Sequence, residues 1–172
     1  MSHLRLPRIP RAIGFGAGLL ALALLLFSAA GALWGLWRPA ITGHRVDGGY
    51  AVDTVANVQF DSFITFAVCT GVLGMVLGAV AYLRGVAYRG VGVLLWVGVA
   101  GVAGAAAFYV FGGVTATSSP ERPGDVVEFV PKFAPHIAWL VAPFMAMFSY
   151  WAAVFVDVPE FASTKSWTGA NK

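Results

Sequence analysis

The stretch that decides the fold is residues 63–83, which read FITFAVCTGVLGMVLGAVAYL. It contains no Asp, Glu, Lys, Arg or His, and as a helix it would be about 31 Å long. The hydrocarbon core of a bilayer is about 30 Å thick, so this segment predicts a transmembrane helix. Three further uncharged stretches lie at residues 12–37, 91–111 and 137–156. The sequence therefore predicts an all-α membrane protein with four transmembrane helices.

The composition agrees with a chain that faces lipid. Of its 172 residues, 59% are hydrophobic and 11% are charged, and the mean hydropathy is +0.78. A soluble domain carries about 25% charged residues. The Lys and Arg residues are scattered, without the basic stripe of a nucleic-acid-binding surface. We therefore expect a single transmembrane domain over residues 1–172, without a nucleic-acid partner.

The first span has an alternative interpretation as a cleaved signal peptide, because three arginines precede it. Its apolar run continues to Leu36, however, beyond the usual h-region of about 7 to 15 residues. We therefore expect a retained helix, with Trp34 and Trp37 in the interfacial aromatic belt. The single cysteine, Cys69, excludes an intrachain disulfide and any multi-cysteine metal site.

The distribution of basic residues predicts the orientation, because cytoplasmic loops are enriched in Lys and Arg. The two terminal segments and the short turn after the second span hold seven basic and two acidic residues, whereas the two longer loops hold four and six. We therefore expect both termini in the cytoplasm. Residues 38–62 and 112–136 are then two external loops of about 24 residues each.

The first external loop carries a hairpin signal, since Asp47-Gly48-Gly49 separates two runs rich in β-branched residues. We expect a small β-ribbon there, lying on the membrane surface. The second loop predicts a turn followed by a short extended piece at residues 126–130.

Acidic residues and histidines in these loops raise the alternative of a metal site. The acids lack the alternating-oxygen spacing of a calcium loop. His44 and His136 lie outside the middle of the spans, where a haem between helices would need its ligands. We expect no metal, haem or other cofactor. The acids in question are Asp47, Asp53, Asp61, Glu121, Asp125 and Glu128.

Small residues form a stripe along the second span at spacings of four, three, four and three. In lipid, helices associate through close backbone approach, which such a stripe permits. We therefore predict a helix-packing seam at Ala67, Gly71, Gly74, Gly78 and Ala81. Comparable stripes in the first and third spans can arise by chance in a chain this rich in Gly and Ala. They comprise Gly14, Ala17, Ala21, Ser28, Gly31 and Gly35, and then Gly98, Gly101 and Ala105.

The fourth span has two opposite faces, and Pro143 is expected to kink it or loosen it locally near its outer end. One face is small, with Ala142, Ala146, Ser149 and Ala153. The other is aromatic, with Phe144, Phe148, Trp151 and Phe155. If the small face packs inward, the aromatic face points away from the bundle. That face then contacts either lipid or a partner subunit, because rigid aromatic side chains are typical anchors of interfaces.

Several function classes are disfavoured by what the spans lack. No ionisable residue lies in the central part of any span, and such residues usually mark proton relays, ion pathways and voltage sensors. The chain has no serine-histidine, HExxH, P-loop or GxGxxG pattern. The two halves show no residue-level repeat of the kind found in inverted-repeat transporters. The chain is therefore expected not to be an enzyme.

Two short motifs carry a resemblance to a known family. The segments ALWGLWRP (residues 32–39) and QFDSF (residues 59–63), with the spacing of the four spans, resemble an actinobacterial family of small integral membrane proteins of unknown function. In size and topology the chain is also similar to small accessory subunits of the actinobacterial cytochrome bcc-aa3 respiratory supercomplex. The resemblance implies a bacterial plasma membrane, with lipids and integral membrane proteins as partners. It supplies no catalytic residues.

These observations lead to one expected function and two rivals. The leading hypothesis is a non-catalytic accessory subunit of a larger membrane complex, plausibly that respiratory supercomplex. The first rival is a small transporter or lipid carrier, which requires an apolar cavity between helices. The second is an envelope-lipid enzyme that uses His44 or His136 with the loop acids.

Overall fold

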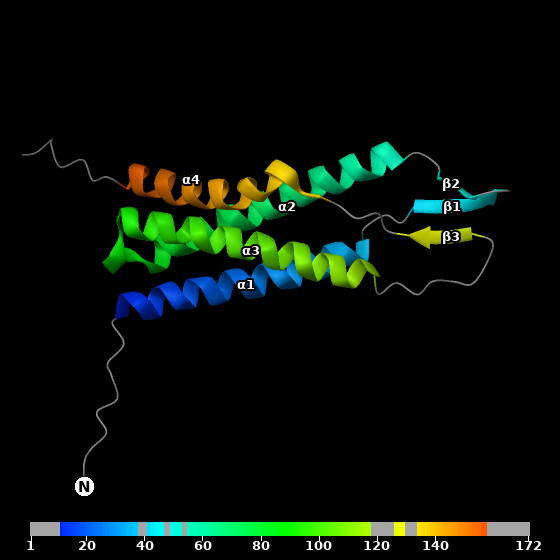
Figure 1. The fold of residues 1–172 in the computed structure, drawn as a ribbon. Coiled ribbons are helices and arrows are strands. Elements are labelled where there is room, and N and C mark those ends of the chain that lie inside the picture. The colour runs from blue at the N-terminus through cyan, green and yellow to red at the C-terminus, as the bar shows by residue number, and fades with distance from the viewer. Residues whose placement is uncertain are drawn as a thin grey trace, which may run out of the picture.

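The computed structural model describes residues 11–37, 41–46, 49–52, 55–117, 126–129 and 134–157. Four helical segments are long and apolar enough to cross a membrane, at Arg11–Trp37, Phe60–Arg84, Val91–Ala116 and His136–Val156. The prediction of four spans is confirmed. The helices lie side by side in one elongated bundle (Figure 1).

The elements follow one another in a simple order. Helix α1 (Arg11–Trp37) is followed by strands β1 (Ile41–Val46) and β2 (Gly49–Val52), and then by α2 (Val55–Arg84). A short 3-10 helix, η1 (Val86–Tyr88), connects α2 to α3 (Val91–Thr117). Strand β3 (Val126–Phe129), the 3-10 helix η2 (His136–Leu140) and α4 (Val141–Val156) complete the described chain.

Two helices extend beyond the spans that hydropathy predicts. Helix α2 begins at Val55 rather than near residue 63, and α3 ends at Thr117 rather than near residue 111. The predicted span stopped at residue 63 because Asp61 and Ser62 are polar, but outside the hydrocarbon core a helix tolerates such residues. The segments between consecutive helices, 38–54 and 118–135, are therefore shorter than the external loops of about 24 residues expected from hydropathy.

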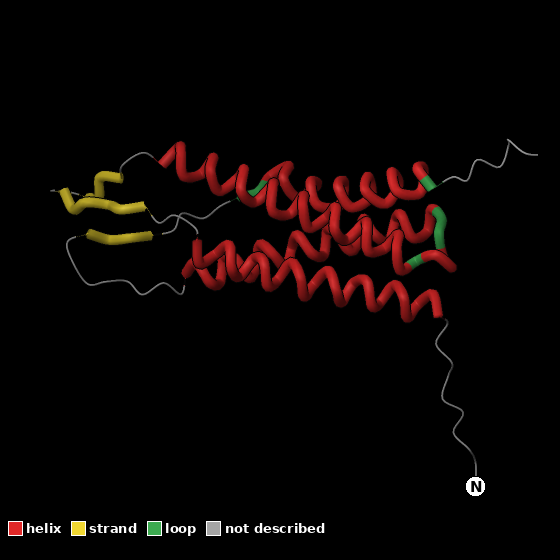
Figure 2. The backbone as a smooth tube through the Cα atoms, turned by 180° about the vertical axis from the view of Figure 1, so that it is seen from behind, coloured by secondary structure: helices red, strands yellow, loops and turns green. Residues whose placement is uncertain are grey.

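The two ends of the bundle differ. Three strands lie at one end, which we call the sheet end, and the turn between α2 and α3 lies at the other, which we call the turn end (Figure 2). The first residues of α1 and the last residues of α4 are both at the turn end (Figure 1). This arrangement follows because the four helices alternate in direction along the chain, so the chain begins and ends at the same end of the bundle.

The strands add a small sheet to a fold that is otherwise helical, in the order β2-β1-β3. β1 pairs antiparallel with β2, with Arg45 opposite Tyr50, and also with β3, with Thr42 opposite Glu128. The sheet thus joins the segment after α1 to the segment after α3. Residues 47 and 48, at the predicted turn, lie outside the described residues. The turn and the position of the strands on the membrane surface remain predictions.

The helices pair chiefly as α1 with α3 and α2 with α4, while α3 also contacts α4. Sequence neighbours α1 and α2 share a much smaller contact. The buried core lies along the middle of these pairs in two clusters. The cluster nearer the turn end contains mostly aliphatic and small residues around Leu77 and Tyr150. The cluster nearer the sheet end is built on Phe27, Phe66 and Phe108.

The fourth span changes helix type near its outer end, where Pro143 is expected to kink it or loosen it locally. Residues His136–Leu140 form a 3-10 turn, and the α-helix begins at Val141. Pro143 therefore lies in the first turn of α4, where its missing N–H leaves no intrahelical hydrogen bond unmade. His136, at the start of η2, has a φ of 41°, a left-handed conformation that non-glycine residues rarely adopt.

Candidate docking surface

The outer surface of α4 carries a row of four aromatic side chains, which we call the aromatic ladder. Its members are 62%, 50%, 52% and 66% exposed in the order Phe144, Phe148, Trp151 and Phe155. Successive ring centroids are 6.1, 6.4 and 5.4 Å apart, and the ring planes are inclined by 12°, 32° and 19°. Each ring therefore packs on the next. This contact restricts the rotamers of the exposed side chains in the isolated chain.

The opposite face of α4 packs against α2 through direct backbone contact. A Cβ added at Gly74 would collide with the carbonyl oxygen of Ala142, and one added at Gly78 would collide with that of Ala146. Glycine is required at both positions, because any side chain would force the two helices apart. The small stripe of α2 and the small face of α4 thus lie against each other, and this contact directs the aromatic ladder outward.

The remaining residues of the two small stripes lie along the same contact. Gly71 faces the Val141 side chain, with 3.1 Å between an added Cβ and Val141 Cγ1. Ser149 donates a hydrogen bond of 3.0 Å from its hydroxyl to the carbonyl oxygen of Met75. Ala81 is fully buried, whereas Ala67 and Ala153 are half-buried at the two ends of the contact.

The stripe of small residues in α1 packs closely against another helix only in its second half. Gly31 and Gly35 are buried against the backbone of α3, at Phe108 and Gly112. In the first half, Ala17 and Ala21 are exposed, and a Cβ added at Gly14 would meet nothing within 4 Å. The buried positions of α1 recur every four residues instead, at Leu19, Ala23, Phe27, Gly31 and Gly35. The stripe of α3 faces α4, where Gly101 lies against the backbone of Pro143 and Gly98 against Met147.

A second set of aromatic residues, which we call the inner aromatic cluster, lies inside the bundle toward the sheet end. The rings of Trp34, Phe66, Phe108 and Trp139 come from α1, α2, α3 and η2 and contact one another at centroid distances of 5.4 to 6.2 Å. Phe66 and Phe108 are fully buried. Trp34 Nε1 donates a hydrogen bond of 3.1 Å to Thr65 Oγ1. Trp34 therefore joins helices, in addition to any role at the membrane interface, while Trp37 is 91% exposed.

No sequence pattern predicts this cluster directly. Its members are spread over four segments, and each by itself resembles an ordinary apolar residue of a span. An inspection of which aromatic residues lie at equal depth, counted from the ends of the spans, would have brought Phe66 and Phe108 together.

The polar side chains within the spans are bonded to nearby backbone. Thr70 Oγ1 donates to the carbonyl oxygen of Phe66 at 2.7 Å, and Thr115 Oγ1 makes a bond of 3.0 Å to the carbonyl oxygen of Ala32 in α1. Cys69 is a half-buried free thiol. The two threonines thus satisfy their hydrogen-bonding needs in helix packing, as buried polar groups generally do. Ser62 differs, because its buried hydroxyl has no hydrogen-bond partner among the described atoms.

The turn end is closed by polar contacts. Arg89 Nη1 lies 2.6 Å from Asp157 Oδ2, and the Arg89 guanidinium lies over the Tyr82 ring, 4.1 Å from its centroid. The backbone N–H of Gly90 donates to the Tyr150 hydroxyl at 3.2 Å. Hydrogen bonds from Tyr82 and then from Arg89 lower the pKa of Asp157. These contacts, which we call the polar clamp, tie the turn after α2 to the end of α4.

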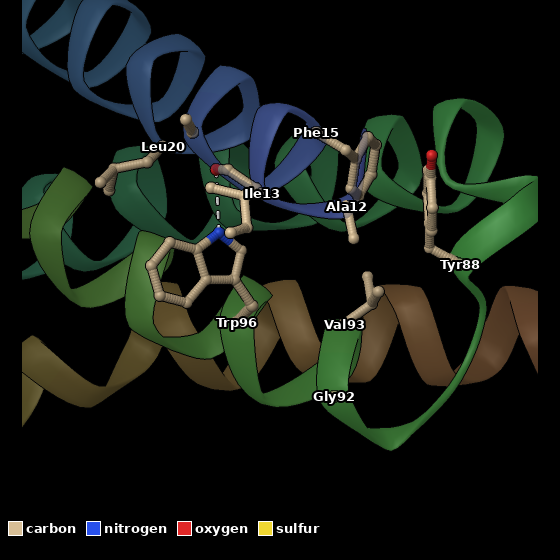
Figure 3. Close-up of a pocket in the computed structure, with 10 residues that line it drawn as sticks. Ala12, Ile13, Phe15, Leu20, Tyr88, Gly92, Val93 and Trp96 are labelled. Carbon is tan, nitrogen blue, oxygen red and sulfur yellow. Dashed lines mark hydrogen bonds between the residues drawn. The ribbon is translucent and has the colours of Figure 1, made fainter. Parts of the chain in front are cut away.

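A separate apolar groove lies between α1 and α3 at the turn end, with a volume of about 710 Å³ (Figure 3). Phe15 and Tyr88 stack at one end of it, with ring centroids 5.6 Å apart. Trp96 lies toward the other end and donates a hydrogen bond of 2.9 Å to the carbonyl oxygen of Gly16. No pattern in the sequence predicts this groove, because its walls come mainly from two helices that are not neighbours in the chain.

Only some of the loop acids and histidines lie in the part of the chain that the structure describes. There, no group of three His, Cys, Asp or Glu residues could hold a metal ion. His136 is exposed at the start of η2, and Asp61 is exposed on α2. His44 belongs to β1, where only the backbone is described, and Asp47, Asp53, Glu121 and Asp125 lie outside the described residues.

Comparison of the chain with protein families, with characterised proteins and with solved structures found no match. The features of the chain that bear on its function are the aromatic ladder, the groove and the packing that places them.

Proposed function

We propose that this chain is a non-catalytic accessory subunit of a larger membrane protein complex and that it docks through the aromatic ladder of α4. The observation that carries the proposal is the row of four stacked aromatic rings, each at least half exposed, on the outside of the bundle. Tryptophan and tyrosine are enriched at interface hot spots, and large rigid rings bury much surface at a low cost in side-chain entropy.

The length of the ladder favours a protein partner over lipid alone. From Phe144 to Phe155 the ladder rises about 16 Å along the helix, which is about half of the hydrocarbon thickness. Aromatic residues that anchor a protein in lipid collect instead in belts at the two membrane interfaces. By contrast, the exposed apolar positions of α2 in the same depth range carry aliphatic side chains, Val76 and Leu83. The two surfaces thus differ in the way that a docking face and a lipid face differ.

The proposal includes an orientation and an assembly. Both termini face the cytoplasm of a bacterial plasma membrane, which the excess of basic residues in the terminal segments and in the turn supports. The strands then lie outside, where they cover the neighbouring subunits. The actinobacterial cytochrome bcc-aa3 supercomplex is the assembly suggested by the resemblance of the sequence, and partner identification tests this choice directly.

The test compares two double variants. Phe148→Leu with Trp151→Leu removes two central rings of the ladder while keeping the surface apolar. Phe111→Leu with Trp37→Leu is the matched control, because these residues are 47% and 91% exposed on other helices. The tagged chain is extracted from its native membrane in a mild detergent, and the proteins and haem that accompany it are quantified.

We expect the ladder variant to lose its accompanying proteins at least tenfold, which corresponds to about 1.4 kcal/mol, while the control keeps them. Recovery of haem-containing subunits with the wild-type chain would support the respiratory assembly. Equal recovery of partners by both double variants would contradict docking through the ladder.

A lipid carrier is the second candidate, and the apolar groove is the observation in its favour. A carrier needs a route along the membrane normal. The residues that line the groove come from the first turns of α1, from Tyr88 of η1 and from the start of α3, so the groove occupies one end of the bundle. The ladder therefore carries the proposed function, and the groove has a different explanation.

A further inference from the structure

We infer that the groove between α1 and α3 is a fixed binding site for one anionic phospholipid, with an acyl chain in the groove and the headgroup phosphate beside Arg11. This inference is independent of docking through α4, because the groove lies on the α1 and α3 side of the bundle (Figures 1 and 3).

The groove results from the way in which α1 and α3 diverge. Toward the sheet end their backbones touch, since a Cβ at Gly31 or Gly35 would collide with the backbone of α3. Toward the turn end, Gly16 faces the Trp96 side chain instead, with 3.1 Å between an added Cβ and Trp96 Nε1. Bulky rings therefore hold the helices apart there, and the small residues between the rings leave a volume unfilled.

The lining suits a hydrocarbon chain. The residues drawn in Figure 3 are almost all apolar, and their polar side-chain groups are the Trp96 N–H, which donates to the carbonyl oxygen of Gly16, and the Tyr88 hydroxyl at one end. The volume of about 710 Å³ lies in the range of small-ligand sites, which is roughly 300 to 1,000 Å³. A chain of methylene groups suits such a surface, because the apolar side chains that form most of it offer no hydrogen bonds.

The charge at the mouth of the groove selects an anionic headgroup. Arg11 is the first residue of α1, directly before the lining residues Ala12 and Ile13. Among the described residues, the ion pair of the turn end is Arg89 with Asp157, and Arg11 has no acidic partner. The positive end of the α1 dipole adds to this potential. In the sequence, Arg5 and Arg8 precede Arg11, so the same chain segment carries further positive charge.

The probes are phosphatidylglycerol and phosphatidylcholine with identical acyl chains. The full-length chain is purified in a mild detergent, exposed to an equal mixture of the two lipids, and examined by native mass spectrometry. The wild-type chain should retain one phosphatidylglycerol in preference to phosphatidylcholine.

Filling the groove tests the acyl-chain site. A Cβ at Gly92 meets nothing within 4 Å, so Gly92→Leu places its side chain in the open groove without a clash. Gly18→Leu is the matched control, because a Cβ at Gly18 also meets nothing within 4 Å and Gly18 does not line the groove. We expect Gly92→Leu to lose the retained lipid and Gly18→Leu to keep it. Ala12→Leu is a second filling variant at an exposed position of the first turn, in case Gly92→Leu fails to fold.

Changing Arg11 tests the headgroup. Arg11→Gln should reduce the preference for phosphatidylglycerol by roughly fivefold, the effect of one basic residue at an anionic surface. Arg11→Lys should preserve the preference, because the charge remains.

Other outcomes would overturn the inference. Undiminished lipid retention by both filling variants would show that the groove holds no acyl chain. The filling variants could instead lose a bound second copy of the chain, or another bound protein, and keep their lipid. The groove would then bind a helix of that protein, and the inference would be wrong. The variant with Phe148→Leu and Trp151→Leu should retain the lipid, so failure of the docking proposal and failure of this inference are distinguishable.

Discussion

Two groups of aromatic residues serve opposite purposes in this bundle. The inner aromatic cluster joins rings from α1, α2, α3 and η2, and its members Phe66 and Phe108 are fully buried. The aromatic ladder draws all its rings from one helix, and each is at least half exposed. Because the hydrophobic effect does not drive helices together within lipid, packing determines stability there. We therefore expect the inner cluster to determine the stability of the fold and the ladder to determine association with a partner.

The largest expected effect comes from emptying the inner cluster. Phe108→Ala should destabilise the bundle by about 3 kcal/mol, because a fully buried ring is replaced by a cavity. Phe148→Ala removes the same side chain from the ladder and should change stability by less than about 0.5 kcal/mol. Reversible unfolding in mixed micelles, followed by circular dichroism, measures both. Equal losses of stability would show that the two aromatic groups do not differ in this way.

The second-largest loss of stability is expected at the contact between α2 and α4, which directs the ladder outward. Gly78→Leu forces a side chain onto the carbonyl oxygen of Ala146, so α2 and α4 must separate. We expect a loss of about 2 kcal/mol, typical of overpacking in a close contact. Gly18→Leu, which meets open space, serves as the control in the same micelle unfolding experiment. A Gly78→Leu protein as stable as the control would show that α2 and α4 do not approach as closely as described.

The smallest change in stability is expected at the turn end, where the polar clamp and not a cluster of aromatic rings holds the helices together. Hydrogen bonds from Tyr82 and Arg89 lower the pKa of Asp157 in the folded protein. The stability that this carboxylate contributes is therefore present above its ordinary pKa of about 3.9 and is lost as pH falls through the lowered folded value.

The measurement is unfolding in micelles over the acid range below about pH 5. The wild-type chain should lose stability as Asp157 becomes protonated, and Asp157→Asn should lack that part of the pH dependence. The effect is small because the ion pair is exposed to solvent, where surface pairs contribute little. Identical acid profiles for the two proteins would contradict a role for the polar clamp in stability.

Much of the helical part of the fold follows from sequence, and the reason is local. A run such as residues 63–83 must satisfy its backbone hydrogen bonds internally if it lies in hydrocarbon, so its helical state needs no knowledge of neighbours. The ends of the helices do not follow in the same way. Helices α2 and α3 continue past the point where hydropathy falls, because water also permits a helix.

The candidate site was predictable to a similar, limited extent. The spacing of Phe144, Phe148, Trp151 and Phe155 places them on one face of any helix, so the ladder can be drawn from sequence alone. The stripe in α1 illustrates the limit, because Gly14 and Gly31 share that stripe but only Gly31 lies against another helix. A stripe of small residues indicates that another helix can approach closely. It does not indicate which part of the stripe that helix contacts.

Three features can be read from the chain alone, since each depends on residues near one another in sequence: four helices of membrane-spanning length, the small and aromatic faces of α4, and the distribution of charge. The tertiary structure alone decided that α1 pairs with α3 and α2 with α4, that β3 joins β1, and that a groove remains beside Trp96. Those features depend on the fit between side chains from distant segments. That fit depends on the three-dimensional shapes of the packed side chains. A linear pattern of residue types does not contain this information.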